Sequence, residues 1–122
     1  MKKLLLIVPF AFASCYDVER DCKDFKTGTF EFTAEINGVK KTTTFERTED
    51  REIDFYDGKS DTATVRWVND CEFVLQKLHP KTMAEKQAIA MKILTTSKNS
   101  YTFEYGVVGS DITQKGTAVK IK

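Results

Sequence analysis

Apolar and polar residues alternate along most of the chain after residue 26, and this alternation predicts β-strands. Residues 27–36 show it most clearly, because polar and apolar side chains exchange at every step and aromatic residues occupy two of the apolar positions. The dipeptide Asn37–Gly38 follows directly and is typical of a two-residue hairpin turn. Such a turn would place Phe30 opposite Phe45 in the next strand. The apolar face of the first strand then carries Phe30, Phe32, Ala34 and Ile36.

The same pattern continues to the C-terminus and predicts eight strands in all. Trp67 should face Phe73 across the fourth and fifth strands. We expect a three-residue connection there, residues 69–71, because a slip of one residue would turn every side chain to the other face. The charged segment 46–52 is expected to be a loop or a strand end. The strands are expected at residues 27–36, 39–45, 53–56, 60–68, 72–78, 91–96, 101–108 and 116–122.

One short helix is expected between the fifth and sixth strands. Thr82 and Glu85 have the spacing of a capping box, in which each side chain bonds the other's backbone N–H. Good helix formers follow through Ala90. The sequence therefore predicts a helix of about two turns at this point.

Eight strands joined by short connections favour an antiparallel meander. Such a meander can close into a barrel that is filled by side chains or holds one small ligand. Residues 27–30, Thr-Gly-Thr-Phe, are similar to the opening Gly-x-Trp of the lipocalins. We therefore predict an all-β fold, a small lipocalin-like barrel or half-barrel with one short helix, and keep a two-sheet β-sandwich as the alternative.

The N-terminus has a different pattern. Two lysines precede an apolar run at residues 4–12, and Phe12–Ala13–Ser14–Cys15 resembles the lipobox of bacterial lipoproteins. The resemblance implies that residues 1–14 are a signal peptide, that residues 15–24 are a lipidated tether beginning at Cys15, and that residues 25–122 form a single β domain. An ordinary secretory signal, with Cys15 present by chance, and a buried N-terminal strand are the alternatives.

A lipidated Cys15 would attach an exported protein to a membrane of the bacterial cell envelope, on its periplasmic or cell-surface side. Such a compartment permits disulfides, so Cys22 and Cys71 are expected to form one. Two unrelated buried thiols are the alternative.

Charge argues against a nucleic-acid partner. The chain has 19 basic and 18 acidic residues, and removal of Lys2 and Lys3 with the signal leaves 17 and 18, a net charge of −1. The single histidine, His79, precedes Pro80 at a strand end, where a surface position is expected. Asp54 and Asp57 do not have the spacing of a calcium loop. We therefore predict no enzyme, no cofactor and no metal site.

Five aromatic residues are candidates for lining a ligand pocket, with a filled core as the alternative: Trp67, Phe73, Tyr101, Phe103 and Tyr105.

Several stretches resemble a group of small bacterial envelope lipoproteins of unknown function. They are Cys15, residues 21–22, residues 27–32, residues 66–73 with the pattern Trp-Val-Asn-Asp-Cys, and residues 100–105. The resemblance and the predicted fold favour a membrane-anchored module that binds another envelope protein or has a structural role. A carrier of a small apolar ligand inside the barrel is the alternative, and a hydrolase using surface carboxylates is the least favoured.

Overall fold

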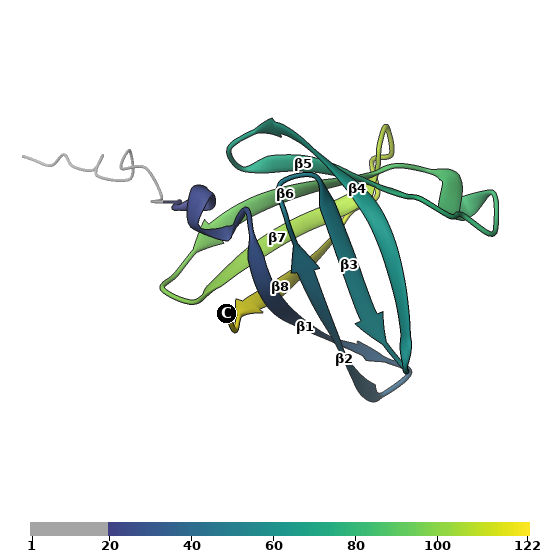
Figure 1. Cartoon of the computed structure of the whole chain (residues 1–122), viewed down its shortest axis with the longest axis horizontal. Coiled ribbons are helices and arrows are strands. Elements are labelled where there is room, and N and C mark those ends of the chain that lie inside the picture. Colours follow the sequence, from purple (N-terminus) through teal and green to yellow (C-terminus); the bar gives the residue numbers. More distant parts are fainter. Residues whose placement is uncertain (1–19) are drawn as a thin grey trace, which may run out of the picture.

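The computed structural model describes residues 20–122, which form a closed barrel of eight antiparallel strands in sequence order (Figure 1). The barrel confirms the predicted all-β meander, and the two-sheet sandwich is not found. Residues 1–14 and Cys15, with the predicted signal peptide and lipobox, lie outside the described residues. The strands are β1 (Gly28–Ile36), β2 (Val39–Arg47), β3 (Arg51–Tyr56), β4 (Lys59–Asn69), β5 (Glu72–Lys77), β6 (Ile89–Thr96), β7 (Ser100–Val107) and β8 (Gln114–Lys120).

The predicted pairing of β1 with β2 is confirmed, since Phe30 lies opposite Phe45. Trp67 lies opposite Phe73 as predicted, but the connection between β4 and β5 is shorter than expected. Only Asp70 and Cys71 separate the strands, and a bulge between Trp67 and Asn69 supplies the extra residue that keeps the register.

The predicted two-turn helix is wrong. The only helical elements within residues 20–122 are two 3-10 turns, η2 (Cys22–Phe25) and η3 (Ala84–Lys86). Thr82 does accept the backbone N–H of Glu85 at 3.1 Å, but the Glu85 carboxylate accepts the N–H of Lys81 at 3.0 Å. The turn ends early because β6 already begins at Ile89, which pairs with β5 and β7. Sheet pairing therefore overrides helix propensity here. None of the helical turns in this part of the chain is long and apolar enough to cross a membrane.

The two ends of the barrel differ. One end, called here the plugged end, carries η2, the β2–β3, β4–β5 and β6–β7 connections and the C-terminus (Figure 1). Cys22 and Phe25 of η2 are buried there, and Cys22 forms the predicted disulfide with Cys71, with an S–S distance of 2.06 Å. The residues before η2 are also attached to the barrel, since the backbone N–H of Asp21 donates to Thr96 at 2.8 Å. The opposite end, called the mouth, carries the β1–β2, β3–β4, β5–β6 and β7–β8 connections.

Aromatic residues fill the interior next to the plugged end. Phe30 stacks on Phe45 with ring centroids 5.2 Å apart, and the edge of Tyr101 packs on Phe25 and Phe30 at 5.3 and 5.7 Å. Strand pairing weakens toward the mouth: β1 pairs with β8 only at Phe30–Phe32. The barrel is therefore tightly closed at one end and splayed at the other.

Candidate functional site

A buried ion pair lies between the plugged end and the interior. Arg47 and Glu52 face each other across β2 and β3, and Arg47 Nη1 donates to Glu52 Oε1 at 3.0 Å. The Arg47 side chain is 0% exposed and that of Glu52 is 8% exposed. The guanidinium also donates to the carbonyl of Phe25 at 2.6 Å and to the hydroxyl of Tyr101 at 3.1 Å. Arg47 therefore joins η2 to the barrel wall while it neutralises Glu52.

Segment 46–52 was expected to be a loop or a strand end, and it contains both, but the burial of Arg47 and Glu52 was not predicted. Only residues 48–50 form the loop, because β2 continues to Arg47 and β3 begins at Arg51. Alternation carries Arg47 to the same face as Phe45, and the register brings Glu52 opposite it. The period-two pattern of β2 was the available indication.

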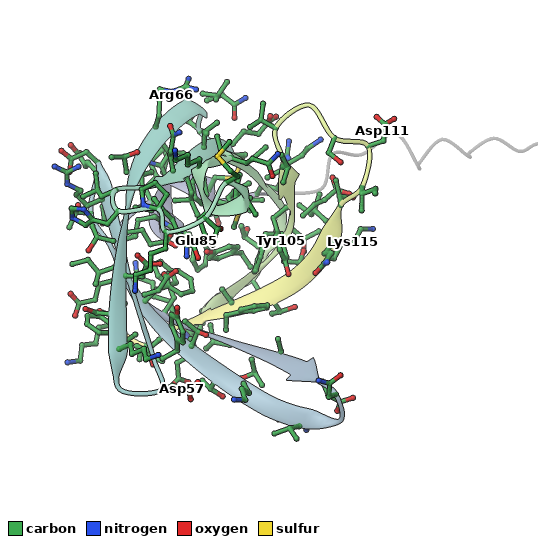
Figure 2. The ribbon with its side chains drawn as sticks, turned by 90° about the vertical axis from the view of Figure 1, so that its right-hand side faces the viewer. Asp57, Arg66, Glu85, Tyr105, Asp111 and Lys115 are labelled. Atoms are coloured by element: carbon green, nitrogen blue, oxygen red, sulfur yellow. A yellow bond between two sulfur atoms is a disulfide. The ribbon has the colours of Figure 1, made fainter. Side chains whose placement is uncertain are left out.

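A cavity occupies the barrel between this ion pair and the mouth. It has two adjoining lobes of about 280 and 310 Å³, which share four lining residues. Figure 2 views the barrel from the mouth side, with Tyr105 and Glu85 on either side of the interior. The shared residues are Glu52, Asp54, Leu75 and Ile89.

The first lobe has an aromatic and apolar wall. Phe32, Phe103 and Tyr105 line it, and their rings follow one another with centroids 5.4 and 5.6 Å apart. Phe32 and Phe103 can approach closely because they pack against Gly116, where an added Cβ would lie 2.6 Å from the Phe32 ring. Met91 completes this side.

The second lobe has an acidic wall. Asp54 and Asp61 lie directly opposite each other on β3 and β4, with Glu52 two residues along β3. Two carboxylates in this position repel. Lys77 relieves part of the repulsion through an ion pair with Asp61 at 2.7 Å, and a weaker one with Glu85 at 3.9 Å.

Asp54 carries the largest perturbation at the site. Burial raises its pKa from 3.8 to about 8, and the negative charge of Glu52, a hydrogen bond with Glu52 and the charge of Asp61 act in the same direction. At neutral pH, Asp54 therefore holds its proton in most molecules. Tyr101, which is also buried, has its pKa raised by desolvation, while Arg47 opposes the shift.

The structure divides the five predicted aromatic residues into two groups. Tyr101, Phe103 and Tyr105 line the first lobe of the cavity. Trp67 and Phe73 do not; their rings pack 4.5 Å apart, and both flank the Arg47 guanidinium.

The acidic wall was not predicted from the sequence. Asp54 was considered as a partner of Asp57, but Asp57 is exposed in the β3–β4 turn, at the edge of the barrel in Figure 2. His79 is exposed as predicted. Among residues 20–122, no group of three or more histidine, cysteine, aspartate or glutamate side chains is arranged to hold a metal ion.

The fold and the cavity together define the class of protein: a small, closed, eight-stranded antiparallel β-barrel with an internal cavity of mixed apolar and acidic lining. Comparison of the chain with known protein families, curated proteins and solved structures found no match.

Proposed function

We propose that this protein binds a small, mainly apolar ligand that carries a positive charge inside its barrel. The observation that carries the proposal is the two-sided cavity, with Phe103 and Tyr105 on one side and Asp54 and Asp61 on the other. Pockets that bind small molecules have this design, in which apolar walls supply most of the contact area and a few polar groups fix the orientation. The sequence had suggested a small apolar ligand as one alternative, and the proposal changes this to a ligand that also carries a positive charge.

The charges in the cavity favour a cation. Glu52 is neutralised by Arg47, and Asp61 shares Lys77 with Glu85. Asp54 has no ion pair within the described residues. An ammonium group placed beside Asp54 and Asp61 would allow both to be ionised, and charge-assisted hydrogen bonds of this kind are among the strongest in proteins.

The proposed role is binding and not catalysis. Cys22 and Cys71 form a disulfide and so have no free thiol, and His79 is exposed on the connection after β5. Neither therefore supplies the nucleophile and base that covalent catalysis requires.

Calorimetric titration with two matched probes tests the proposal. Octylammonium and octanoate have the same chain length and opposite charge, and we expect only octylammonium to bind. Asp54→Asn and Asp61→Asn should each weaken it about 10- to 100-fold, the loss expected for a hydrogen bond to a charged group. Glu31→Gln, which changes an exposed carboxylate outside the cavity, is the control and should have no effect. Equal binding of the two probes, or binding of neither, would refute the proposed ligand class.

We also propose that the chain is exported to the bacterial cell envelope and held at a membrane by lipid on Cys15. The pattern of residues 1–15 supports this. The backbone N–H of Asp21, just before η2, donates to Thr96 at the plugged end, so an anchor would leave the mouth free. Cys15→Ser should abolish labelling with radioactive palmitate in intact cells. Persistent labelling of the variant would contradict the anchor.

A second candidate function is the docking of another envelope protein. The β1–β2 hairpin extends beyond the paired part of the barrel: β8 pairs with β1 only up to Phe32, and β3 pairs with β2 only from Thr44 onward. Unpaired strand edges can accept a strand from a partner.

Photocrosslinking in intact cells tests this second candidate. A crosslinker placed at Thr42, on the hairpin, should capture one reproducible neighbour, whereas one placed at Lys98, at the plugged end, should not. If Thr42 captures no reproducible protein, the hairpin is not a docking site.

A further inference from the structure

Exposed apolar side chains gather at the mouth. Of the ten large apolar residues that are exposed within residues 20–122, seven lie on or beside the four connections there, and every connection contributes at least one. Met83 and Ile112 are the most exposed, at 75% and 78%. Single exposed apolar residues are ordinary, but a ring of them around one opening marks an interaction surface. The ring, called here the rim, comprises Val39, Phe55, Tyr56, Leu78, Met83, Val108 and Ile112.

Lysines accompany the rim. Five exposed lysines lie on or beside the same connections, and none of them forms an ion pair with another of the described residues. Among the described residues, the exposed carboxylates at the mouth that form no ion pair are Glu35 and Asp111. Asp57 is also exposed there, but it pairs with Lys41 at 3.7 Å. The mouth therefore presents apolar tips among surplus positive charge. The five lysines are Lys40, Lys59, Lys81, Lys86 and Lys115.

We infer that the mouth docks on the surface of a lipid bilayer that contains anionic headgroups. Apolar side chains that enter the headgroup boundary, together with lysines near the phosphates, are the two components of interfacial membrane binding. The five lysines beside the rim favour an anionic bilayer as the partner, since an apolar surface that binds a neutral partner would not need unpaired lysines.

The geometry gives the contact a use. The acidic lobe of the cavity is lined by Ala84 and Glu85, which lie in the same connection as Met83. A ligand could then pass between the bilayer and the cavity without crossing water. The contact itself does not depend on the proposed ligand. It is also separate from the proposed anchor, because η2, the first described element, lies at the opposite end (Figure 1).

Sedimentation with vesicles tests the inference. The protein used is residues 20–122, which form the folded barrel, so that neither an acyl chain nor the apolar run at residues 4–12 contributes. We expect it to sediment with vesicles of phosphatidylcholine and phosphatidylglycerol, and to bind pure phosphatidylcholine vesicles much more weakly. Added salt should release it, because the lysine contribution is screened.

Matched variants separate the rim from the rest of the surface. The double variant Met83→Ser and Ile112→Ser should lower the partition constant about tenfold for each side chain that enters the membrane. Val68→Ser with Val119→Ser is the control, since these residues are 58% and 44% exposed but lie away from the mouth. The control pair should bind like the parent.

Lysine variants test the choice of headgroup. Lys81→Gln with Lys86→Gln should weaken binding to the anionic vesicles about fivefold per lysine and leave the weak binding to neutral vesicles unchanged. Lys98→Gln, at the plugged end, is the control and should have no effect.

Three results would overturn the inference. In the first, the protein does not sediment with anionic vesicles. In the second, the rim and control double variants lose equal amounts of vesicle binding. In the third, the rim variant loses a crosslink to a protein in cells although the parent does not bind vesicles. The last would make the rim a protein-docking surface. The substituted rim, lysine and control residues are all exposed, so we expect the variants to fold like the parent. An unchanged urea midpoint of unfolding checks this. Because octylammonium binding is measured without vesicles, failure of this inference is distinguishable from failure of the proposed function.

Discussion

Arg47 should contribute more to stability than Glu52, although the two form one ion pair. Arg47→Met keeps most of the side-chain volume but leaves Glu52 buried without a counter-ion, and breaking a buried pair in this way costs about 3–5 kcal/mol. The carbonyls of Phe25 and Lys26 also lose their guanidinium donors, which lie 2.6 and 3.1 Å away. We therefore expect a loss of about 4–6 kcal/mol, a large part of the roughly 5–15 kcal/mol that stabilises a domain.

Glu52→Gln should cost less, about 1–3 kcal/mol. The amide oxygen can still accept from Arg47, and the guanidinium keeps its bonds to Tyr101 and to two carbonyls. It also stays over the ring of Phe73, 4.7 Å from the centroid. The Arg47 guanidinium therefore still has hydrogen-bond acceptors for its buried charge after Glu52→Gln.

Equilibrium unfolding in urea, with the disulfide intact, measures both losses. The double variant Arg47→Met with Glu52→Gln should lose less than the sum of the single losses, because the unpaired charge is gone. Lys41→Met, which breaks an exposed pair with Asp57, is the control and should cost under about 1 kcal/mol. The reasoning fails if Glu52→Gln costs as much as Arg47→Met, or if the double loss is additive.

Three further predictions concern other parts of the barrel. Asp54→Asn should raise the free energy of unfolding at pH 8–9 and change it little at pH 4. The Asp54 carboxyl of the folded wild type keeps its proton up to pH about 8, whereas that of the unfolded chain releases it near pH 3.8. The stability of the wild type therefore falls as the pH rises between these two values, and the variant does not share this fall. Parallel pH curves of melting temperature for the two proteins would contradict this. Cys22→Ser and Cys71→Ser should each cost about 4 kcal/mol on the chain-entropy model, and the double variant no more than either, in urea unfolding; additive losses would argue against one shared bond. Gly116→Ala should cost about 1–3 kcal/mol, because its Cβ would meet the Phe32 ring at 2.6 Å, and an unchanged melting temperature would show that the ring can move aside.

The sequence predicted those parts of the fold that local chemistry determines. Asn37–Gly38 fixes the β1–β2 register, because a two-residue turn allows only one pairing of the two strands. A slip of one residue would expose Phe30 and Phe45. The disulfide followed from the count of cysteines once export was assumed. Trp67 and Phe73 predicted the β4–β5 register correctly even though the connecting loop was misjudged, since their aromatic pair outweighs the loop length.

The interior charges could not be predicted in the same way. Period-two alternation places Arg47 inward, but its burial depends on partners far along the chain: the carbonyl of Phe25, 22 residues earlier, and the hydroxyl of Tyr101, 54 residues later. The Asp54–Asp61 pair was closer to being predictable. A two-residue turn at Asp57 and Gly58 places these two aspartates opposite each other, but the general rule that carboxylates face solvent pointed the other way.

The acidic wall also explains how a small domain can contain so large a cavity. If it were sealed and dry, an apolar cavity of about 280 Å³ would cost about 7 kcal/mol at 24 cal/mol per Å³, a large part of the roughly 5–15 kcal/mol that stabilises a domain. This cavity instead opens toward the mouth. Carboxyl groups such as Asp54 and Asp61 change this balance, because a polar cavity holds water that hydrogen-bonds to its walls. Binding is then an exchange in which ligand replaces water. The gain comes from the side lined by Phe103 and Tyr105, where water makes the poorest contacts, and it should appear as a negative heat-capacity change when octylammonium binds.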